Sequence, residues 1–327
     1  MIKRHFLRSA ALSLALAGLA TLPATAADPY PNHPIKLVVP LPPGGGGDSV
    51  ARIMAAELTT RLNQTVYVEN KPGGGSIIGT QLVSKAPADG YTLLFATDFH
   101  AINGAFGKLP FDSVKDFAPV AQLVELQIIL LANPKLGVKN LGELVAAAKK
   151  EPGKVIFGSP GTSSPHYLAS KLLQQLAGVE LLDVPYQGTG PVTTAFLGAQ
   201  IDLMFAGVGA GMSLAQTGKA VPIAVTGPRR DALARDVPTV AESGYGNYSL
   251  ASWMAVLAPA GTPEPIVQKL NAQIRAVLAD KAVAKKLADA GFTVATGTPE
   301  QLGTLVSTDI DKLKQIIAKA GAVPEGR

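Results

Sequence analysis

The chain has 327 residues, of which 47% are hydrophobic and only 6% aromatic, and its formal net charge is +5. A chain of this length buries one large core or two medium ones, and two is the better expectation. An interior of Val, Leu, Ile and Ala suits parallel α/β layers better than an aromatic-rich β-sandwich. The absence of cysteine excludes disulfides, thiol catalysis and iron–sulfur chemistry.

The first 26 residues have the pattern of an export signal. Residues 3–8 carry three basic side chains, residues 10–20 are apolar, and the Ala-Thr-Ala of residues 24–26 is a small-residue cleavage site. The apolar stretch is shorter than the roughly 20 residues that span a bilayer. We therefore expect cleavage after Ala26, a periplasmic location, and a soluble, monomeric mature chain. Its formal charge is then +2, because the leader holds three basic residues and no acidic one.

Strand, loop and helix alternate through the first third of the mature chain. Residues 35–39 predict a buried strand, and the Gly-rich residues 42–48 end in Asp48, which can cap the following helix. Apolar residues four apart in residues 50–62 predict that helix. The same order of strand, loop and helix then repeats, with a strand at residues 66–68, a turn at 71–75 and a helix from Ser76.

A strand at residues 91–96 completes this βαβ pattern and leads to Thr97, Asp98 and His100. A third unit starts with a strand at residues 154–157 and a loop at 158–163.

The helix after this loop has clear boundary signals. Ser164 is the expected cap, Pro165 the first helical residue, and Gly178 the stop after Ala177. Further strands are expected at 181–185, 201–205, 221–226 and 249–258, and helices at 263–278, 281–290 and 299–320. Thr262 and Pro263 predict a cap and start for the first of these helices, and Thr298 with Gln301 a capping box for the last. The order of elements predicts an α/β protein whose chain crosses more than once between two domains.

Two strand-to-helix loops are the best candidates for a binding site. In residues 42–48, glycines before a helix expose backbone N–H groups, which suit an anion together with the positive end of the helix dipole. The Asp48 carboxylate competes for the first helical amides, and a plain glycine turn is an equally good interpretation. Residues 158–163 form a second such loop with three hydroxyls, and ligands of open α/β sheets collect beyond the carboxyl ends of strands.

Other functional classes have little support. Neither loop has the spacing of a nucleotide-binding motif, so no cofactor is expected, and no basic run interleaved with aromatics suggests nucleic acid. No G-x-S-x-G elbow surrounds Ser159 or Ser163, and the mature chain's three histidines lack metal spacing. For His166 a surface or capping role is the better interpretation, as a solvated or capping role is for Asp98. Trp253 and Tyr186 could line a pocket, although a lone Trp is more often core.

Several short blocks, in order, resemble the solute receptors of tripartite tricarboxylate transporters, the Bug-type periplasmic binding proteins. The resemblance runs from Tyr30 to the C-terminus. The blocks are residues 30–31, 35–40 with 42–48, 68–73, 89–94, 115–117, 184–186, 236–239 and 258–263.

The resemblance implies a two-lobed, Venus-flytrap fold of type II, each lobe a mixed, mainly parallel sheet flanked by helices. Residues 28–127 with 249–327 would form lobe 1 and residues 128–248 lobe 2, with hinge strands near Gln127 and Ser249. It implies a non-enzymatic receptor that captures a small carboxylate between the lobes, through backbone amides and bridging waters, for a membrane permease or for sensing. Carried over by position, the ligand-binding candidates are Pro43, Gly44, Gly45, Gly46, Gly73, Gly74, Gly75, Ser76, Thr97, Ser159, Gly161, Thr162 and Ser163.

Two departures from the family pattern bear on the ligand. The family often has an acidic residue after residues 204–205, where this chain has Ala206 and Gly207, which argues against an amino-acid ligand. Pro160 and Pro165 are also unusual in the second loop. Two alternatives stay open: a periplasmic hydrolase with His166 as base and Ser163 as nucleophile, and a module that senses ligand for a partner kinase.

Overall fold

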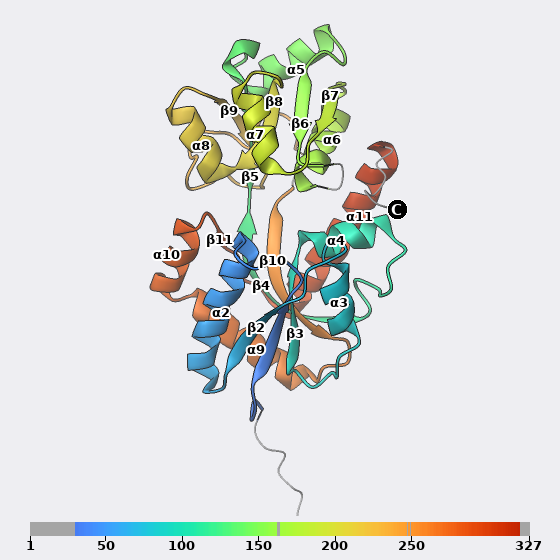
Figure 1. The fold of residues 1–327 in the computed structure, drawn as a ribbon, viewed down its shortest axis with the longest axis vertical. Helices are drawn as coiled ribbons and strands as arrows, with labels where there is room; N and C mark the ends of the chain where they lie inside the picture. The colour runs from blue at the N-terminus through green and yellow to red at the C-terminus, as the bar shows by residue number, and fades with distance from the viewer. Residues whose placement is uncertain (1–29, 162–163, 247, 249, 321–327) are drawn as a thin grey trace, which may run out of the picture. The chain divides into compact units, whose positions relative to one another are not determined.

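The computed structural model describes residues 30–161, 164–246, 248 and 250–320 (Figure 1). The described residues from His33 onward form one compact unit that holds two β-sheets. The first sheet has six strands in the order β11-β4-β10-β3-β1-β2, and the second has five in the order β7-β6-β8-β5-β9. The strands are β1 (Ile35–Val39), β2 (Val66–Asn70), β3 (Thr92–Thr97), β4 (Phe117–Leu126), β5 (Ile128–Ala132), β6 (Ile156–Ser159), β7 (Leu182–Pro185), β8 (Leu203–Gly207), β9 (Val221–Val225), β10 (Ser252–Pro259) and β11 (Thr293–Val294).

The described helices follow the strands much as the alternating pattern predicts. They are α2 (Gly46–Leu62), α3 (Ile77–Ser84), α4 (Asp98–Phe106), α5 (Leu141–Lys150), α6 (Pro165–Ala177), α7 (Thr189–Leu197), α8 (Val208–Gln216), α9 (Glu264–Leu278), α10 (Lys281–Asp289) and α11 (Pro299–Ala320), with a short 3-10 turn, η1 (Pro134–Leu136). In the part of the chain that the structure describes, none of these helices has both the length and the apolar character needed to cross a membrane.

The six-stranded sheet is mixed. Strands β2, β1 and β3 are parallel, with Leu37 opposite both Val68 and Leu93. Strand β10 is antiparallel to both β3 and β4. The first three strands come from the predicted βαβ pattern, since a crossover helix joins parallel neighbours. The expectation of an α/β fold with two mixed sheets flanked by helices is confirmed.

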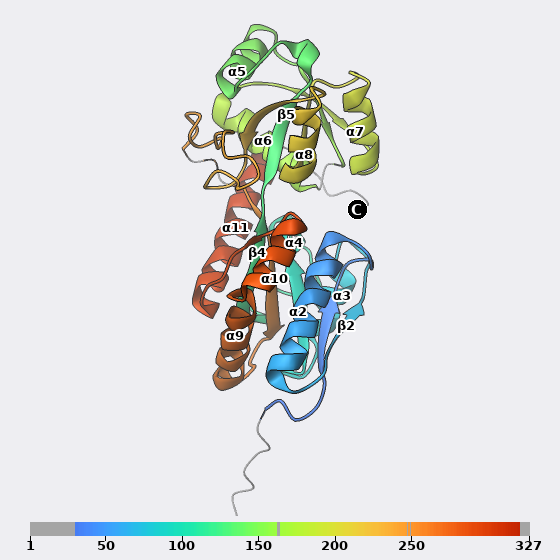
Figure 2. The same ribbon diagram turned by 90° about the vertical axis from the view of Figure 1, so that its left-hand side faces the viewer.

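Helices cover both faces of this sheet because its central strands are apolar on both sides. On β3, Leu94 and Ala96 belong to a core cluster that includes residues of α3, α4 and α11. Phe95, which points the other way, lies beside the start of α2, 3.5 Å from where a Cβ of Gly47 would stand. Helix α2 packs against α9, and α9 and α11 both pack against β4 (Figure 2).

The chain passes from the six-stranded to the five-stranded sheet where β4 continues into β5, with Gln127 between them (Figure 1). It returns between β9 and β10. The two crossings are bonded to each other: the Gly227 N–H donates to Gln127 Oε1 at 3.1 Å, and the Ile128 N–H donates to Thr226 Oγ1 at 3.2 Å. These contacts join the outgoing and returning segments at one point of the molecule.

The predicted helix boundaries hold at some ends and fail at others. Ser164 caps α6 by accepting the Tyr167 N–H at 3.2 Å, and α6 ends at Gly178 in the left-handed conformation, as predicted. Thr298 and Gln301 form the predicted reciprocal capping box. Thr262 does not cap α9, whose N-cap is Pro263. Asp48 does not cap α2 either: the N-cap is Gly45, so Asp48 lies within the first turn.

Candidate functional site

A mostly apolar cavity with a volume of about 470 Å³ is lined by residues from the sides of both sheets. This volume lies within the range of about 300–1,000 Å³ that is typical of small-molecule sites. Its walls are mostly apolar, with a few polar groups among them. The lining residues are Leu41, Thr97, Asp98, Phe99, Leu126, Ile128, Pro160, Ser164, Pro165, His166, Gly188, Thr189, Ser252, Trp253 and Met254.

Three helices begin at this cavity, and their N-termini differ in how they are capped. Helix α4 begins after Thr97 on the six-stranded side, and α6 and α7 begin after Ser164 and Gly188 on the five-stranded side. The Ser164 side chain caps α6, whereas neither Thr97 nor Gly188 makes a side-chain cap hydrogen bond. Helix N-termini without a cap leave backbone N–H donors and the positive dipole end for an anion. The first turns of α6 and α7 contain no acidic residue.

Two residues that line the cavity each have a buried side-chain polar atom without a hydrogen-bond partner. These atoms are Oγ1 of Thr97, a residue only 5% exposed, and Nδ1 of His166. Buried polar atoms in native proteins almost always have a partner, so an orphaned one calls for a ligand or water. Thr97 comes from the end of β3 and His166 from the first turn of α6, so the two residues line the cavity from the sides of different sheets.

His166 is neutral in this environment. Burial lowers the pKa of its imidazole from about 6.5 to about 4. His166 lines the cavity and its Nδ1 is buried, which the sequence did not indicate. A neutral imidazole can donate one hydrogen bond from Nδ1 to a carboxylate oxygen without bringing a charge.

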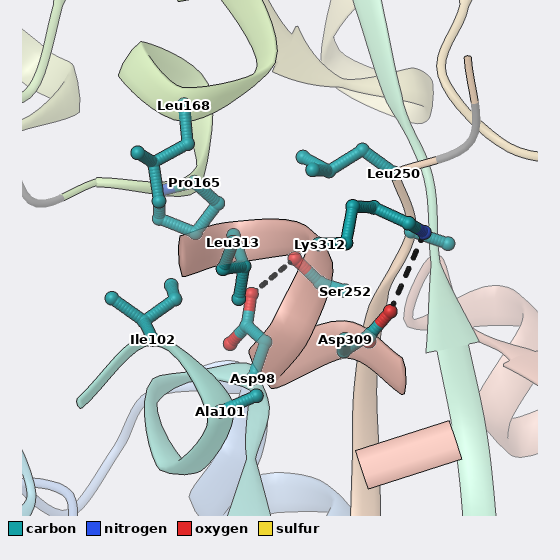
Figure 3. Close-up of a pocket in the computed structure, with 11 residues that line it drawn as sticks. Asp98, Ala101, Ile102, Pro165, Leu168, Leu250, Ser252, Asp309, Lys312 and Leu313 are labelled. Carbon is teal, nitrogen blue, oxygen red and sulfur yellow. Dashed lines mark hydrogen bonds and ion pairs between the residues drawn. The ribbon is translucent and has the colours of Figure 1, made fainter. Parts of the chain in front are cut away.

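Asp98 is the acidic residue of the cavity. Burial raises the pKa of its carboxyl to about 6, against hydrogen bonds from Ser252 Oγ and from the backbone N–H groups of Phe99 and of Asp98 itself. The Ser252 hydroxyl donates to Asp98 Oδ2 at 2.6 Å (Figure 3). The Asp98 carboxyl thus accepts hydrogen bonds from the first backbone N–H groups of α4, as a capping role predicts. It is not solvated, however, and its place in the cavity wall was missed.

A second, much smaller cavity of about 30 Å³ lies on the other side of Asp98, and its volume suits a water molecule but no metabolite. Figure 3 shows Asp98 and Ser252 in its wall, together with Asp309 and Lys312 of α11 and Pro165 of α6. Asp309 Oδ2 accepts the Trp253 Nε1–H at 2.8 Å, and its Oδ1 pairs with Lys312 Nζ at 3.5 Å. Trp253 therefore has its indole N–H anchored behind the larger cavity that its ring lines.

The predicted loop at residues 42–48 contributes little to this cavity. From this stretch and its approach only Leu41 lines the wall, while Pro43, Gly44, Gly45 and Gly46 are exposed. The Gly44 N–H donates to Asp48 Oδ2 at 2.9 Å, so the expected competition by the carboxylate occurs at Gly44 itself. Hydrogen bonds from Arg52 first, then from Gly44 and Asn70, lower the pKa of Asp48 to about 2. A permanent negative charge therefore occupies this loop.

The second glycine run, Gly73, Gly74 and Gly75 before Ser76, also lies away from the residues that line the cavity. Its glycines have φ of 130°, 58° and 61°, and Ser76 follows at 78°. Four successive residues with positive φ form a turn that residues with a side chain rarely adopt, which explains the glycines without a ligand. The Asn103 Nδ2–H closes the turn by donating to the Gly75 oxygen at 2.7 Å.

The described part of the predicted loop at residues 158–163 borders the cavity. Pro160 lines the wall, while Ser159 is fully buried with its hydroxyl 3.4 Å from the Gly161 oxygen. That same Gly161 oxygen accepts the Ser164 hydroxyl at 2.6 Å. Thr162 and Ser163 lie outside the described residues. Thr97 is thus the one member of the predicted set that lines the cavity within the part that the structure describes.

The sequence reasoning missed most of the wall, and only part of it had a signal. Phe99 and Asp98 follow directly after the predicted strand end, in the position where ligands collect, and could have been found there. Gly188 and Thr189 begin a helix preceded by a strand, which is the same signal. Leu126, Ile128 and Met254 are apolar residues of strands near the crossing, and nothing in the sequence separates them from ordinary core residues.

The described residues contain no cluster of three or more His, Asp or Glu side chains that could hold a metal ion. The cavity offers one carboxyl and one imidazole. Its chemistry, a concave apolar site with helix N-termini and a few hydrogen-bond donors, is that of reversible binding to a small molecule.

Two α/β sheets joined by crossing strands, with a ligand-sized cavity lined from both, define a two-lobed solute-binding protein. Comparison with known proteins gives the family. The model of the tripartite tricarboxylate transporter family receptor matches residues 50–322. The protein BugT of Bordetella pertussis is 33% identical over 312 residues, which cover 94% of this chain and 95% of BugT.

Two solved structures that were determined with ligands are also similar. One, an R. palustris protein with adipate, is 30% identical with a TM-score of 0.74, over 90% of this chain and 99% of that one. The other, MatC from Rhodopseudomonas palustris with bound malate, is 32% identical with a TM-score of 0.69, over 88% of this chain and all of MatC. The chain belongs to the receptor family of tripartite tricarboxylate transporters, as its sequence motifs predict. It is a solute-binding receptor and not an enzyme.

Proposed function

We propose that this protein captures a small carboxylate in the 470 Å³ cavity and presents it to a membrane permease of the tripartite tricarboxylate type. One observation carries the proposal: α7 begins at the cavity with no side-chain cap and no acidic residue in its first turn, and two lining residues, Thr97 and His166, each have an unpartnered polar atom. A carboxylate would satisfy these donors, because an anion at a helix N-terminus gains both hydrogen bonds and dipole attraction. The adipate and malate bound to the two related proteins support a carboxylate.

The binding residues in this proposal differ in part from the predicted set. Thr97 stays as a hydrogen-bond donor to the ligand, and the loop of residues 158–163 stays as a neighbour of the ligand through Pro160. His166 and the first turn of α7 join them. The glycine runs at 43–46 and 73–75 would act through the shape of the loops rather than through their own amides.

The strand membership supports a two-lobed organisation with residues 28–127 and 249–327 in one lobe and 128–248 in the other. All described strands of the six-stranded sheet fall in the first set, and those of the five-stranded sheet in the second. Ligand contacts from both lobes would favour a closed arrangement, and closure would be the signal that a permease or a sensor kinase reads. Export by the signal of residues 1–26, cleaved after Ala26, would bring the mature monomer to the periplasm where the family works.

The test is calorimetric titration of the purified protein with mono- and dicarboxylates, comparing wild type with Thr97→Val. This substitution keeps the shape and removes the unpartnered hydroxyl, so ligand affinity should fall by roughly fivefold, as for the loss of one hydrogen bond. Thr80→Val is the matched control, since the hydroxyl of this buried threonine is bonded within α3 to the Ser76 oxygen at 2.8 Å. Equal affinity in both variants would remove Thr97 from the site, and no binding of any carboxylate by wild type would refute the function.

A further inference from the structure

The cavity wall carries an uneven distribution of charge. Among the described residues that line it, Asp98 and His166 are the only ionisable side chains, and none is a lysine or an arginine. Asp98 belongs to the first turn of α4 on the six-stranded side, where it bonds the first backbone amides of that helix. An acidic residue in the first turn neutralises the dipole end that would otherwise attract an anion. This side of the cavity therefore repels negative charge.

The opposite side has the reverse character. Helix α7 begins at Thr189 after Gly188, with no side-chain cap and no acidic residue in its first turn. Helix α6 places neutral His166 in the same wall, with an unpartnered Nδ1. A single carboxylate is accommodated here, at the N-termini of α6 and α7, with the dipoles of both helices directed at it.

A second carboxylate on the same ligand finds no partner in the described wall. It would have to lie toward the six-stranded side, where Asp98 stands and a cation is missing from the lining residues. Lys312 lines the small cavity behind Asp98, not the larger one, and pairs there with Asp309 (Figure 3). The buried Asp98 carboxylate repels a like charge placed near it, so a dianion is penalised in this cavity.

The rest of the wall on that side is apolar and partly aromatic. Phe99 and Met254 line it together with Leu41 and Leu126, whereas Trp253 is only 3% exposed and offers the cavity little surface of its own. The Trp253 indole is held in place by its hydrogen bond to Asp309. Fixed aromatic walls of this kind gain binding energy from flat, apolar ligand bodies.

We infer that the ligand is a monocarboxylate with an apolar, preferably aromatic body, whose carboxylate lies at α6 and α7, and that Asp98 excludes a second carboxylate. This inference rests on the proposed function, because it places the ligand in the same cavity. It differs from the dicarboxylates found with the two related proteins. Specificity here comes from an unfavourable element, a carboxylate set against the wrong ligand, as well as from attraction.

The experiment compares two ligands of similar length by calorimetric titration of the purified protein. 3-Phenylpropionate carries one carboxylate, and adipate carries two. Wild type should bind 3-phenylpropionate about 30-fold more tightly than adipate, and Asp98→Asn should reduce this ratio to about threefold by removing one like-charge interaction. Asp289→Asn is the control for net charge, since Asp289 is exposed on α10 and pairs with Lys285. It should leave the ratio unchanged.

A second variant, Leu126→Lys, keeps the inference testable should Asp98→Asn fail to fold. It adds a cation to the apolar side and should raise adipate affinity about tenfold relative to 3-phenylpropionate. Adipate binding as tight as 3-phenylpropionate in wild type overturns the inference and leaves the proposed function standing. A ratio that neither variant changes overturns the role of Asp98. If neither ligand class, nor any other carboxylate, binds to wild type, the proposed function itself fails.

Discussion

The two sides of the cavity are built by the same local rule and have opposite electrostatic character. On each side a strand ends, and a helix begins at the cavity wall. The α4 side carries Asp98 in its first turn, while the first turns of α6 and α7 carry no acid. A strand-to-helix loop is therefore an anion site only when its first helical turn leaves the amides unoccupied.

In the loop before α2, outside the cavity, an acidic residue likewise occupies the free amide. It is the most glycine-rich of the strand-to-helix loops, yet Asp48 takes the Gly44 amide and is itself bonded to Arg52 at 2.9 Å. The number of glycines thus says less about anion binding than the single acidic residue that follows them.

Thr189→Asp should give the largest effect, because it makes the first turn of α7 resemble that of α4. A like charge within several Å of the bound carboxylate costs roughly 3 kcal/mol at an effective dielectric constant near 20, or about 100-fold in affinity. Thr194→Asp adds the same charge at an exposed position of α7 outside the lining residues. Titration calorimetry should show nearly unchanged affinity for this control, and equal loss in both variants would contradict the placement of the carboxylate.

The pH dependence of stability should have opposite signs on the two sides. His166 has a folded pKa of about 4, below its unfolded value near 6.5, so its contribution is lost as the pH falls through this window. Asp98 has a folded pKa of about 6, above its unfolded value near 3.8, so its ionisation destabilises the fold and acid relieves this. The polar and charged groups around Asp98 are Ser252, His166, and Asp309 and Lys312 of α11. Of these groups, only His166 is changed in either of the two variants, His166→Gln and Asp98→Asn.

Denaturant unfolding at pH 7 and pH 4.5 measures these two contributions. On acidification, wild type should lose about 2 kcal/mol more of its free energy of unfolding than His166→Gln does. It should lose about 2 kcal/mol less than Asp98→Asn does. His100, whose pKa burial also lowers to about 4, contributes equally in all three proteins and cancels in the comparison. The same sign in both variants would show that one of the two side chains is not buried as described.

Trp253→Phe tests the apolar wall of the six-stranded side. The substitution keeps an aromatic ring but leaves Asp309 without the indole N–H, which should lower the free energy of unfolding by about 1–2 kcal/mol. Affinity for 3-phenylpropionate should fall by roughly threefold to fivefold because of the smaller ring. Since Trp253 is the only tryptophan of the chain, ligand binding to wild type should change the intrinsic fluorescence. A ligand that binds without changing the fluorescence would place the site elsewhere.

Ser164→Ala and Asn140→Ala compare a capped helix at the cavity with a capped helix outside it. Ser164 accepts the Tyr167 N–H, and Asn140 accepts the Glu143 N–H at 2.9 Å at the start of α5. Each loss should cost about 1 kcal/mol of stability, as measured by thermal unfolding. Only Ser164 lines the cavity, so a small loss of affinity, about twofold, is expected for that variant alone. Reduced affinity in Asn140→Ala would indicate an indirect effect.

The fold could be predicted where the chain is locally consistent. Strand β1 was expected at residues 35–39, where it lies, and the cap, start and stop of α6 were read correctly from Ser164, Pro165 and Gly178. No element was predicted between the end of β3 and residue 154, where α4, β4, β5 and α5 lie. Strand β5 is a five-residue run that is buried throughout, and such short apolar runs lack the periodicity that separates strand from helix.

The sequence predicted the type of junction at which the site lies, but not most of the residues that line it. Strand-to-helix junctions were expected to bind the ligand, and Thr97 at one of them lines the cavity. The glycine runs drew attention away from α7, whose start at Gly188 and Thr189 has a single glycine as cap. Glycine content reflects the backbone conformation of a turn, as at residues 73–75, and this requirement is independent of ligand binding.

The family, the α/β alternation and several helix ends could be predicted because they depend on residues close together in the chain. Which junctions share a cavity, and how deeply Asp98 and His166 are buried there, depends on tertiary packing. Burial, and with it the charge state of a titratable group, is set by residues far away in the chain. The polarity of the binding site is for this reason a property of the packed molecule, although each residue that creates it can be read in the sequence.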